Sequence, residues 1–93
     1  MYNGRHCTLQ DYELLVRETN KLLEVLTVIE IVDQSKELKK YFKLIERFDA
    51  EIANKLRLNL SKDGMPVSKM IEILTRYIDE LKQNVLVDIN EHN

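Results

Sequence analysis

The stretch VLTVIEIV, residues 25–32, decides whether this chain is entirely helical. Six of its eight residues are apolar and most of these are β-branched, a composition that is typical of strands. As a strand it has no second strand of comparable strength to pair with, and an isolated strand leaves its backbone groups unpaired. The stretch also continues a helical spacing that begins before it. We therefore expect a helix here, and a strand is the alternative.

Residues at helical spacing predict a first helix from about residue 9 to about residue 32. Thr8 is expected to cap its start, and Asp11 follows where the helix dipole favours an acid. Neither Gly nor Pro marks its end. Residues 33–35 are the expected break, and a helix that continues through them is the alternative. The core face of this helix comprises Tyr12, Leu15, Val16, Thr19, Leu22, Leu23, Leu26 and Ile29.

The second helix, expected over about 36–58, shows the clearest separation of faces. Its apolar residues gather in an arc of about 120° on a helical wheel. They are Leu38, Tyr41, Phe42, Ile45, Phe48, Ile52 and Leu56. The opposite face is basic and comprises Lys36, Lys39, Lys40, Lys43 and Arg47. The alternating segment KLRLNL, residues 55–60, is interpreted as the end of this helix fraying into a loop.

Residues 61–64, Ser-Lys-Asp-Gly, carry the strongest turn signal in the chain. Pro66 suits the first position of a third helix, which is expected over 66–84 or longer, with Val85 and Ile89 continuing its apolar face. The sequence thus predicts an all-α, antiparallel three-helix bundle that can associate into a larger helical bundle. Its expected organisation is a flexible tail over 1–8, one helical domain over 9–89 and a frayed end over 90–93.

Composition limits the class of protein and the cellular location that we expect. It has 93 residues, a net charge of −2, and only two Gly, one Pro and one Cys. A single cysteine excludes a disulfide-held scaffold, and the polar N-terminal stretch does not resemble a signal peptide. The longest apolar run is far shorter than the ~20 residues of a membrane span. We therefore expect a cytoplasmic protein.

The sequence offers little for catalysis or for metal binding. The two histidines, His6 and His92, lie in the tails, so the Glu-x-x-His pairs of a di-iron bundle are absent. His6 and Cys7 are adjacent and are interpreted as solvated tail residues, because two neighbouring ligands do not make a tetrahedral site. No Asp or Glu is expected to interrupt an apolar stripe, where burial would tune its pKa. We expect no enzyme activity, no catalytic residues, no cofactor, no metal and no small-molecule substrate.

The chain carries more apolar helical surface than the core faces use. An apolar helix end must be covered, either by the segment 85–89 folding across VLTVIEIV or by a partner. A second copy of the chain or a helical protein is the partner that we expect. The candidate protein interface comprises Val25, Val28, Ile31, Val32, Leu86 and Val87.

The basic row of the second helix, Lys36, Lys39, Lys40, Lys43 and Arg47, is the candidate face for an anionic partner. Its simplest interpretation is the solvated side of an amphipathic helix. It can also follow a phosphate backbone, although it lacks the Asn, Gln and Arg set that reads bases. The expected function is a small non-enzymatic interaction or oligomerisation module, of a composition typical of small bacterial or phage accessory and regulatory proteins. A small nucleic-acid-binding protein is the alternative.

Overall fold

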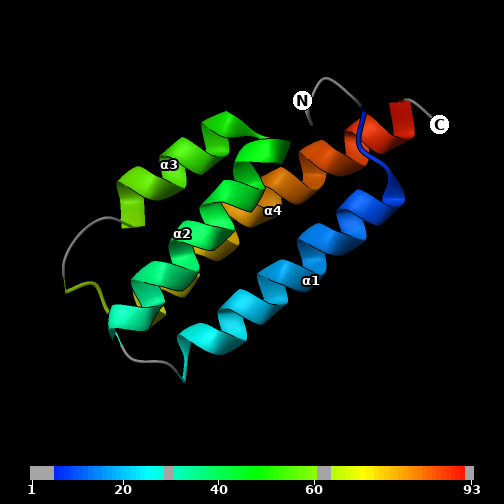
Figure 1. Ribbon diagram of the computed structural model, residues 1–93. Helices are drawn as coiled ribbons and strands as arrows, with labels where there is room; N and C mark the ends of the chain where they lie inside the picture. The colour runs from blue at the N-terminus through cyan, green and yellow to red at the C-terminus, as the bar shows by residue number, and fades with distance from the viewer. Residues whose placement is uncertain (1–5, 29–30, 61–63, 92–93) are drawn as a thin grey trace.

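The structure is a computed structural model that describes residues 6–28, 31–60 and 64–91. Within these residues the chain forms four helices and no strand, which confirms the all-α class (Figure 1). The prediction of three helices is wrong, because the expected helix over 36–58 is divided in two. The helices are α1 (Leu9–Leu26), α2 (Ile31–Phe48), α3 (Ala50–Leu60) and α4 (Val67–Glu91).

The four helices run alternately up and down. In Figure 1, α2 returns antiparallel to α1, α3 folds back along α2, and α4 runs behind α2, antiparallel to α1. Each helix packs against two neighbours, so that α1 contacts α2 and α4, and α3 also contacts α2 and α4. The result is a four-helix arrangement in place of the three-helix bundle expected from the sequence.

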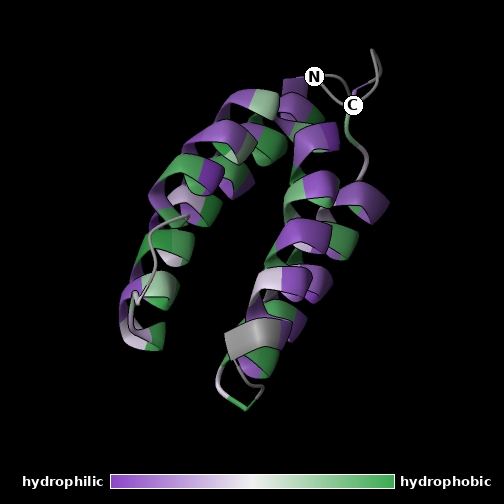
Figure 2. Cartoon of the chain, turned by 60° about the vertical axis from the view of Figure 1, so that its left-hand side comes forward, coloured by the Kyte–Doolittle hydropathy of each residue, from purple (hydrophilic) through white to green (hydrophobic). Residues whose placement is uncertain are grey.

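The core lies between the helices and takes its side chains from all of them. Figure 2 shows that the helices carry both hydrophilic and hydrophobic residues along their length. The apolar faces predicted by helical spacing are the buried faces. Residues three and four positions apart lie on the same side of a helix, so these side chains point together toward the core. The largest fully buried side chains are those of Leu15, Leu26, Ile45, Leu56, Leu74, Ile78 and Leu81.

Asp49 separates α2 from α3. Its backbone N–H donates to the carbonyl of Ile45 at 2.8 Å and so completes the last turn of α2. Its carboxylate accepts the backbone N–H groups of Glu51, at 3.0 Å, and Ile52, at 3.2 Å, and so caps the start of α3. The carboxylate accepts N–H groups that backbone carbonyls would accept in a continuous helix. A new helix can therefore begin here without leaving its first N–H groups unpaired.

An ion pair shows how sharply the chain turns at Asp49. Arg57 on α3 pairs with Glu46 on α2. These residues are eleven positions apart, so in one straight helix their Cα atoms would be separated by about 16 Å, beyond the reach of the two side chains. The pair therefore requires α3 to fold back along α2.

The stretch VLTVIEIV is divided between two helices. α1 ends at Leu26, six residues before the expected end at residue 32, and α2 begins at Ile31. The expected break over 33–35 is therefore wrong, since these residues lie within the first turns of α2. The buried side chain of Gln34 donates to the carbonyl of Leu26 at 3.1 Å. Because the last carbonyls of a helix have no partner within it, this amide stabilises the helix end at Leu26.

The other helix ends follow the sequence more closely. Thr8 forms a capping box with Asp11, which confirms the predicted N-cap. α3 continues through Leu60, so the segment 55–60 is helical and does not fray. Gly64 adopts a positive φ of 75° in the turn before α4, a conformation that favours glycine. α4 continues to Glu91, which agrees with a helix longer than 66–84 and extends into the segment expected to fray.

Replacing the cap between α2 and α3 tests this account of the turn. We expect Asp49→Ala to lower the free energy of unfolding by about 1 kcal/mol, because two backbone N–H groups lose their acceptor. Urea denaturation followed by circular dichroism measures the change. Asp79→Ala, at an exposed position on α4, is the control. Equal stability of the two variants would contradict a capping role for Asp49.

Candidate interaction surfaces

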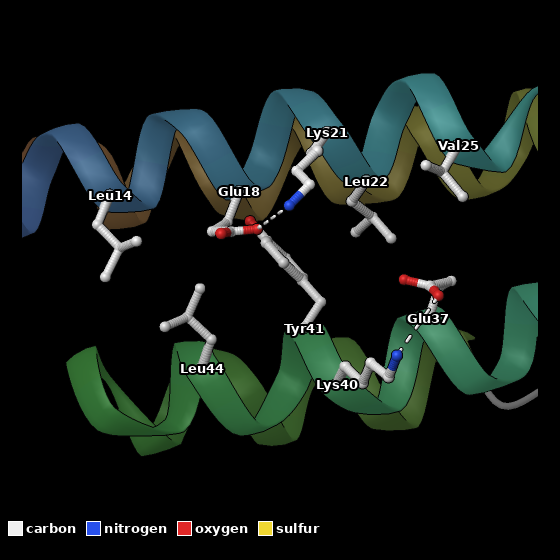
Figure 3. Close-up of a pocket in the computed structure, with 9 residues that line it drawn as sticks. All are labelled: Leu14, Glu18, Lys21, Leu22, Val25, Glu37, Lys40, Tyr41 and Leu44. Carbon is white, nitrogen blue, oxygen red and sulfur yellow. Dashed lines mark ion pairs between the residues drawn. The ribbon is translucent and has the colours of Figure 1, made fainter.

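An open groove runs along the bundle between α1 and α2. It has a volume of about 380 Å³ and is drawn in Figure 3. The two helices are antiparallel here, so the N-terminal part of α1 faces the C-terminal part of α2. Its lining residues are Leu14, Glu18, Lys21, Leu22 and Val25 on α1, and Glu37, Lys40, Tyr41 and Leu44 on α2.

The floor of the groove is formed by two buried residues, and the hydroxyl group of one of them is hydrogen-bonded. Leu22 and Tyr41 are buried. The hydroxyl of Thr19 donates to the carbonyl of Leu15 at 2.7 Å, so its oxygen is left to accept a hydrogen bond from the Tyr41 hydroxyl. Burial raises the pKa of the Tyr41 phenol above its ordinary value, which keeps this donor protonated.

The walls of the groove combine half-buried apolar groups with charged groups. Leu14 and Leu44 face one another at one end, and Val25 lies on α1 at the other (Figure 3). Between them, Glu18 pairs with Lys21 at 3.7 Å. On α2, Glu37 pairs with Lys40, also at 3.7 Å. Apolar groups with a charged margin are the usual anatomy of a protein interface.

The candidate interface residues expected from the sequence are divided by the structure. Val25 lines the groove, and Val28 is 77% exposed beyond the end of α1. Ile31 and Val32 belong to the first turn of α2, and their side chains lie outside the described part of the chain. These positions lie at the end of the bundle where α1 gives way to α2 (Figure 1).

Leu86 and Val87 lie at the opposite end of the bundle. α4 is antiparallel to α1, so its last turns lie beside the start of α1 (Figure 1). Leu86 is half-buried and Val87 is 51% exposed. The prediction that the segment 85–89 could fold across VLTVIEIV is therefore wrong, since helix order places the two segments apart. Val85 and Ile89 are instead buried in the core with the rest of the α4 face.

The basic row of α2 is exposed along its length. All five members, Lys36, Lys39, Lys40, Lys43 and Arg47, are exposed. Acidic residues lie on the same helix, and Lys40 pairs with Glu37. The positive charge of the row is therefore partly neutralised. Lys40 also lines the groove and so belongs to both surfaces.

A buried carboxylate at the far end of the bundle was not anticipated from the sequence. Asp88 on α4 is only 3% exposed, and it accepts the backbone N–H of Cys7 at 2.6 Å. His6 Nδ1 lies 3.2 Å from its other oxygen. The expectation that no acid interrupts an apolar stripe is wrong here. Asp88 follows Leu81 and Val85 at helical spacing, and this position was the available signal.

Asp88 and the backbone bond hold residues 6–8 against α4. Cys7 is 6% exposed and belongs to the core, so the expectation that it is a solvated tail residue is wrong. Residues 1–5 lie outside the described residues. Across the described parts of the chain, no three His, Cys, Asp or Glu side chains are grouped to hold a metal ion. The arrangement is a strap that fixes the start of α1 to the end of α4.

The thiol inside the strap is held in its protonated form. Burial, reinforced by the negative charge of Asp88, raises the pKa of Cys7 from 9.0 to about 11. An unfolded chain therefore loses this proton at lower pH than the folded chain. The stability from this difference is fully present below pH 9 and is lost as the pH rises through about 11. A neutral buried thiol reacts slowly with electrophiles.

We expect Asp88→Asn to loosen the strap. An amide removes the charge that strengthens the bond from Cys7 N–H, and an imperfectly paired buried group costs about 1–3 kcal/mol of stability. Alkylation of the Cys7 thiol should be faster than in the wild type under native conditions, and the urea midpoint should be lower. Asp79→Asn, on the exposed side of the same helix, is the control. An unchanged alkylation rate would exclude Asp88 as the residue that holds the strap.

Two further observations bear on function. None of the helices in the described residues has the length and apolar content needed to cross a membrane. Comparison with known protein families, curated proteins and solved structures found no match to this chain. A proposal for its function therefore depends on the chemistry of its own surfaces.

Proposed function

We propose that this chain is a small non-enzymatic protein-interaction module that acts in the cytoplasm and binds a protein surface through the groove between α1 and α2. The groove carries the proposal, because it is open, has a volume of about 380 Å³, and has apolar residues at both ends. Apolar groups with a polar margin are typical of protein interfaces. A single cysteine without a disulfide partner supports a reducing location.

Docking at the groove would bury apolar surface that the monomer leaves half-exposed. Leu14, Val25 and Leu44 are each half-buried, so a partner would gain part of the ~1.5–3 kcal/mol that full burial of such a side chain contributes. Three such gains amount to a few kcal/mol. Val28, three residues after Val25, is exposed beyond the end of α1 and adds apolar surface near this end of the groove. These gains suit reversible association.

The polar groups of the groove suit binding better than catalysis. Glu18 and Glu37 pair with lysines at the open margin, and the Tyr41 hydroxyl is committed to Thr19. A catalytic acid or base needs a shifted pKa at a reactive position. Asp88, the one buried carboxylate among the described residues, lies in the strap and not in the groove.

Substitution of Val25 tests the module directly. We expect Val25→Glu to abolish self-association at high micromolar concentration, or binding of an apolar fluorescent dye, because it places a charge in the apolar strip. Sedimentation velocity and dye fluorescence measure the two, and circular dichroism reports whether helicity is retained. Val28→Glu should weaken either readout less. A wild-type chain that stays monomeric and binds no dye would refute the proposal.

Binding of a nucleic acid through α2 is the second candidate, favoured by the exposure of all five basic residues of the row. It would depend on phosphate contacts, so binding should fall steeply with salt. We expect the double variant Lys40→Glu, Arg47→Glu to abolish a mobility shift of double-stranded DNA at low salt, with Lys82→Glu on α4 as the control. A wild-type chain that gives no shift under these conditions would end this candidate.

A further inference from the structure

One stripe on α1 has a symmetry of its own. Leu14, Glu18, Lys21 and Val25 follow one another at spacings of four, three and four residues, which places them in an arc of about 60° on one side of the helix. All four line the groove. Read from either end, the stripe is apolar, charged, charged, apolar, and the two charges are opposite. Its midpoint lies between Glu18 and Lys21.

We propose that the occupant of the groove is a second copy of this chain, docked with its α1 antiparallel to the first α1 about a twofold axis at that midpoint. This inference rests on the proposed function. In this register Leu14 meets Val25 of the partner copy, and Glu18 meets Lys21 of the partner copy. A twofold axis makes every contact twice, which is the property of an isologous interface.

The register follows from charge. In a parallel alignment Glu18 would face its own copy and Lys21 would face its own copy, and like charges in contact oppose binding. In the antiparallel alignment each acid faces a base. The intrachain distance of 3.7 Å between Glu18 and Lys21 leaves both groups able to make a second ion pair, and Lys21 has a side chain that is 68% exposed.

The apolar ends fit the same register. Leu14 and Leu44 face one another across one end of the groove (Figure 3), and together they form an apolar socket. The antiparallel α1 of a second copy brings its Val25 to this socket, and the twofold axis repeats the contact at the other end. The contact is short, because Leu14 and Val25 are about 16 Å apart along α1. A dimer this small should dissociate in the micromolar range, roughly 1–100 μM.

Cysteine cross-linking tests the register. We expect Leu14→Cys chains mixed with Val25→Cys chains to form a disulfide-linked dimer under mild oxidation. Chains carrying either substitution alone should not cross-link to themselves, because the equivalent positions would lie about 16 Å apart along the helix, beyond the ~7 Å between Cα atoms that a disulfide allows. Both variants also carry Cys7, which is buried. The wild-type chain, oxidised in the same way, shows whether Cys7 itself forms cross-links.

Charge reversal provides the independent test. Glu18→Lys and Lys21→Glu should each weaken the dimer on the order of tenfold, because two ion pairs of modest strength become repulsions. A mixture of the two single variants should recover the affinity as a heterodimer, since each lysine then faces a glutamate. Glu13→Lys and Lys39→Glu, exposed and away from the groove, should leave the dimer unchanged.

The outcomes separate this inference from the proposed function. A monomeric chain that still binds an apolar dye, with binding lost in Val25→Glu, would overturn the second copy as occupant and leave the groove as a binding site for another protein. A dimer in which Leu14→Cys links to itself would overturn the antiparallel register. Cross-linking of the mixed pair alone, with recovery in the mixed charge variants, is the result that we expect.

Discussion

The fold depends on the reversal of the chain at Asp49, where the carboxylate caps the start of α3. One straight helix over residues 31–60 would be about 45 Å long, longer than any other helix in the described chain. By accepting the N–H groups of Glu51 and Ile52, Asp49 makes it favourable to begin a new helix one residue after the old one ends. The ion pair between Glu46 and Arg57 then lies across the turn. Four helices can surround one core because this one segment is doubled back.

Sequence reasoning identified the faces of the helices better than their ends. The buried apolar residues of α2 and α4 lie on the faces that helical spacing selected, because a face is defined by many residues and does not depend on any one of them. The buried polar residues Gln34 and Asp88 were not selected. The ends at Leu26 and Asp49 involve side chains that lie outside the apolar pattern. Gln34 caps a helix eight residues before it, and Asp49 both ends and begins a helix, so neither effect is visible in periodicity. Thr8 was predictable because its capping partner is local.

For the candidate surfaces too, features within one helix could be predicted from the sequence, whereas features formed by two distant segments could not. The exposure of the basic row on α2 could be predicted, since all its members lie on one face of one helix. The groove could not, because its walls come from two helices whose alignment depends on the turn between them. Val25 was identified as lying off the core, but Tyr41, which lines the same groove from α2, was assigned to the core face of that helix. Asp88 was missed because its partner, Cys7, is 81 residues away.

The strap between Cys7 and Asp88 also constrains the order in which the molecule is assembled. Contacts between α1 and α2, α2 and α3, and α3 and α4 join segments that are consecutive in the chain, and such local contacts form quickly. The bond from Cys7 to Asp88 closes a loop of 81 residues and carries the largest loop-closure entropy. During synthesis a ribosome must complete most of α4 before this bond can form. Until α4 has been synthesised, the side chains of α1 and α3 that contact α4 have no partner from that helix.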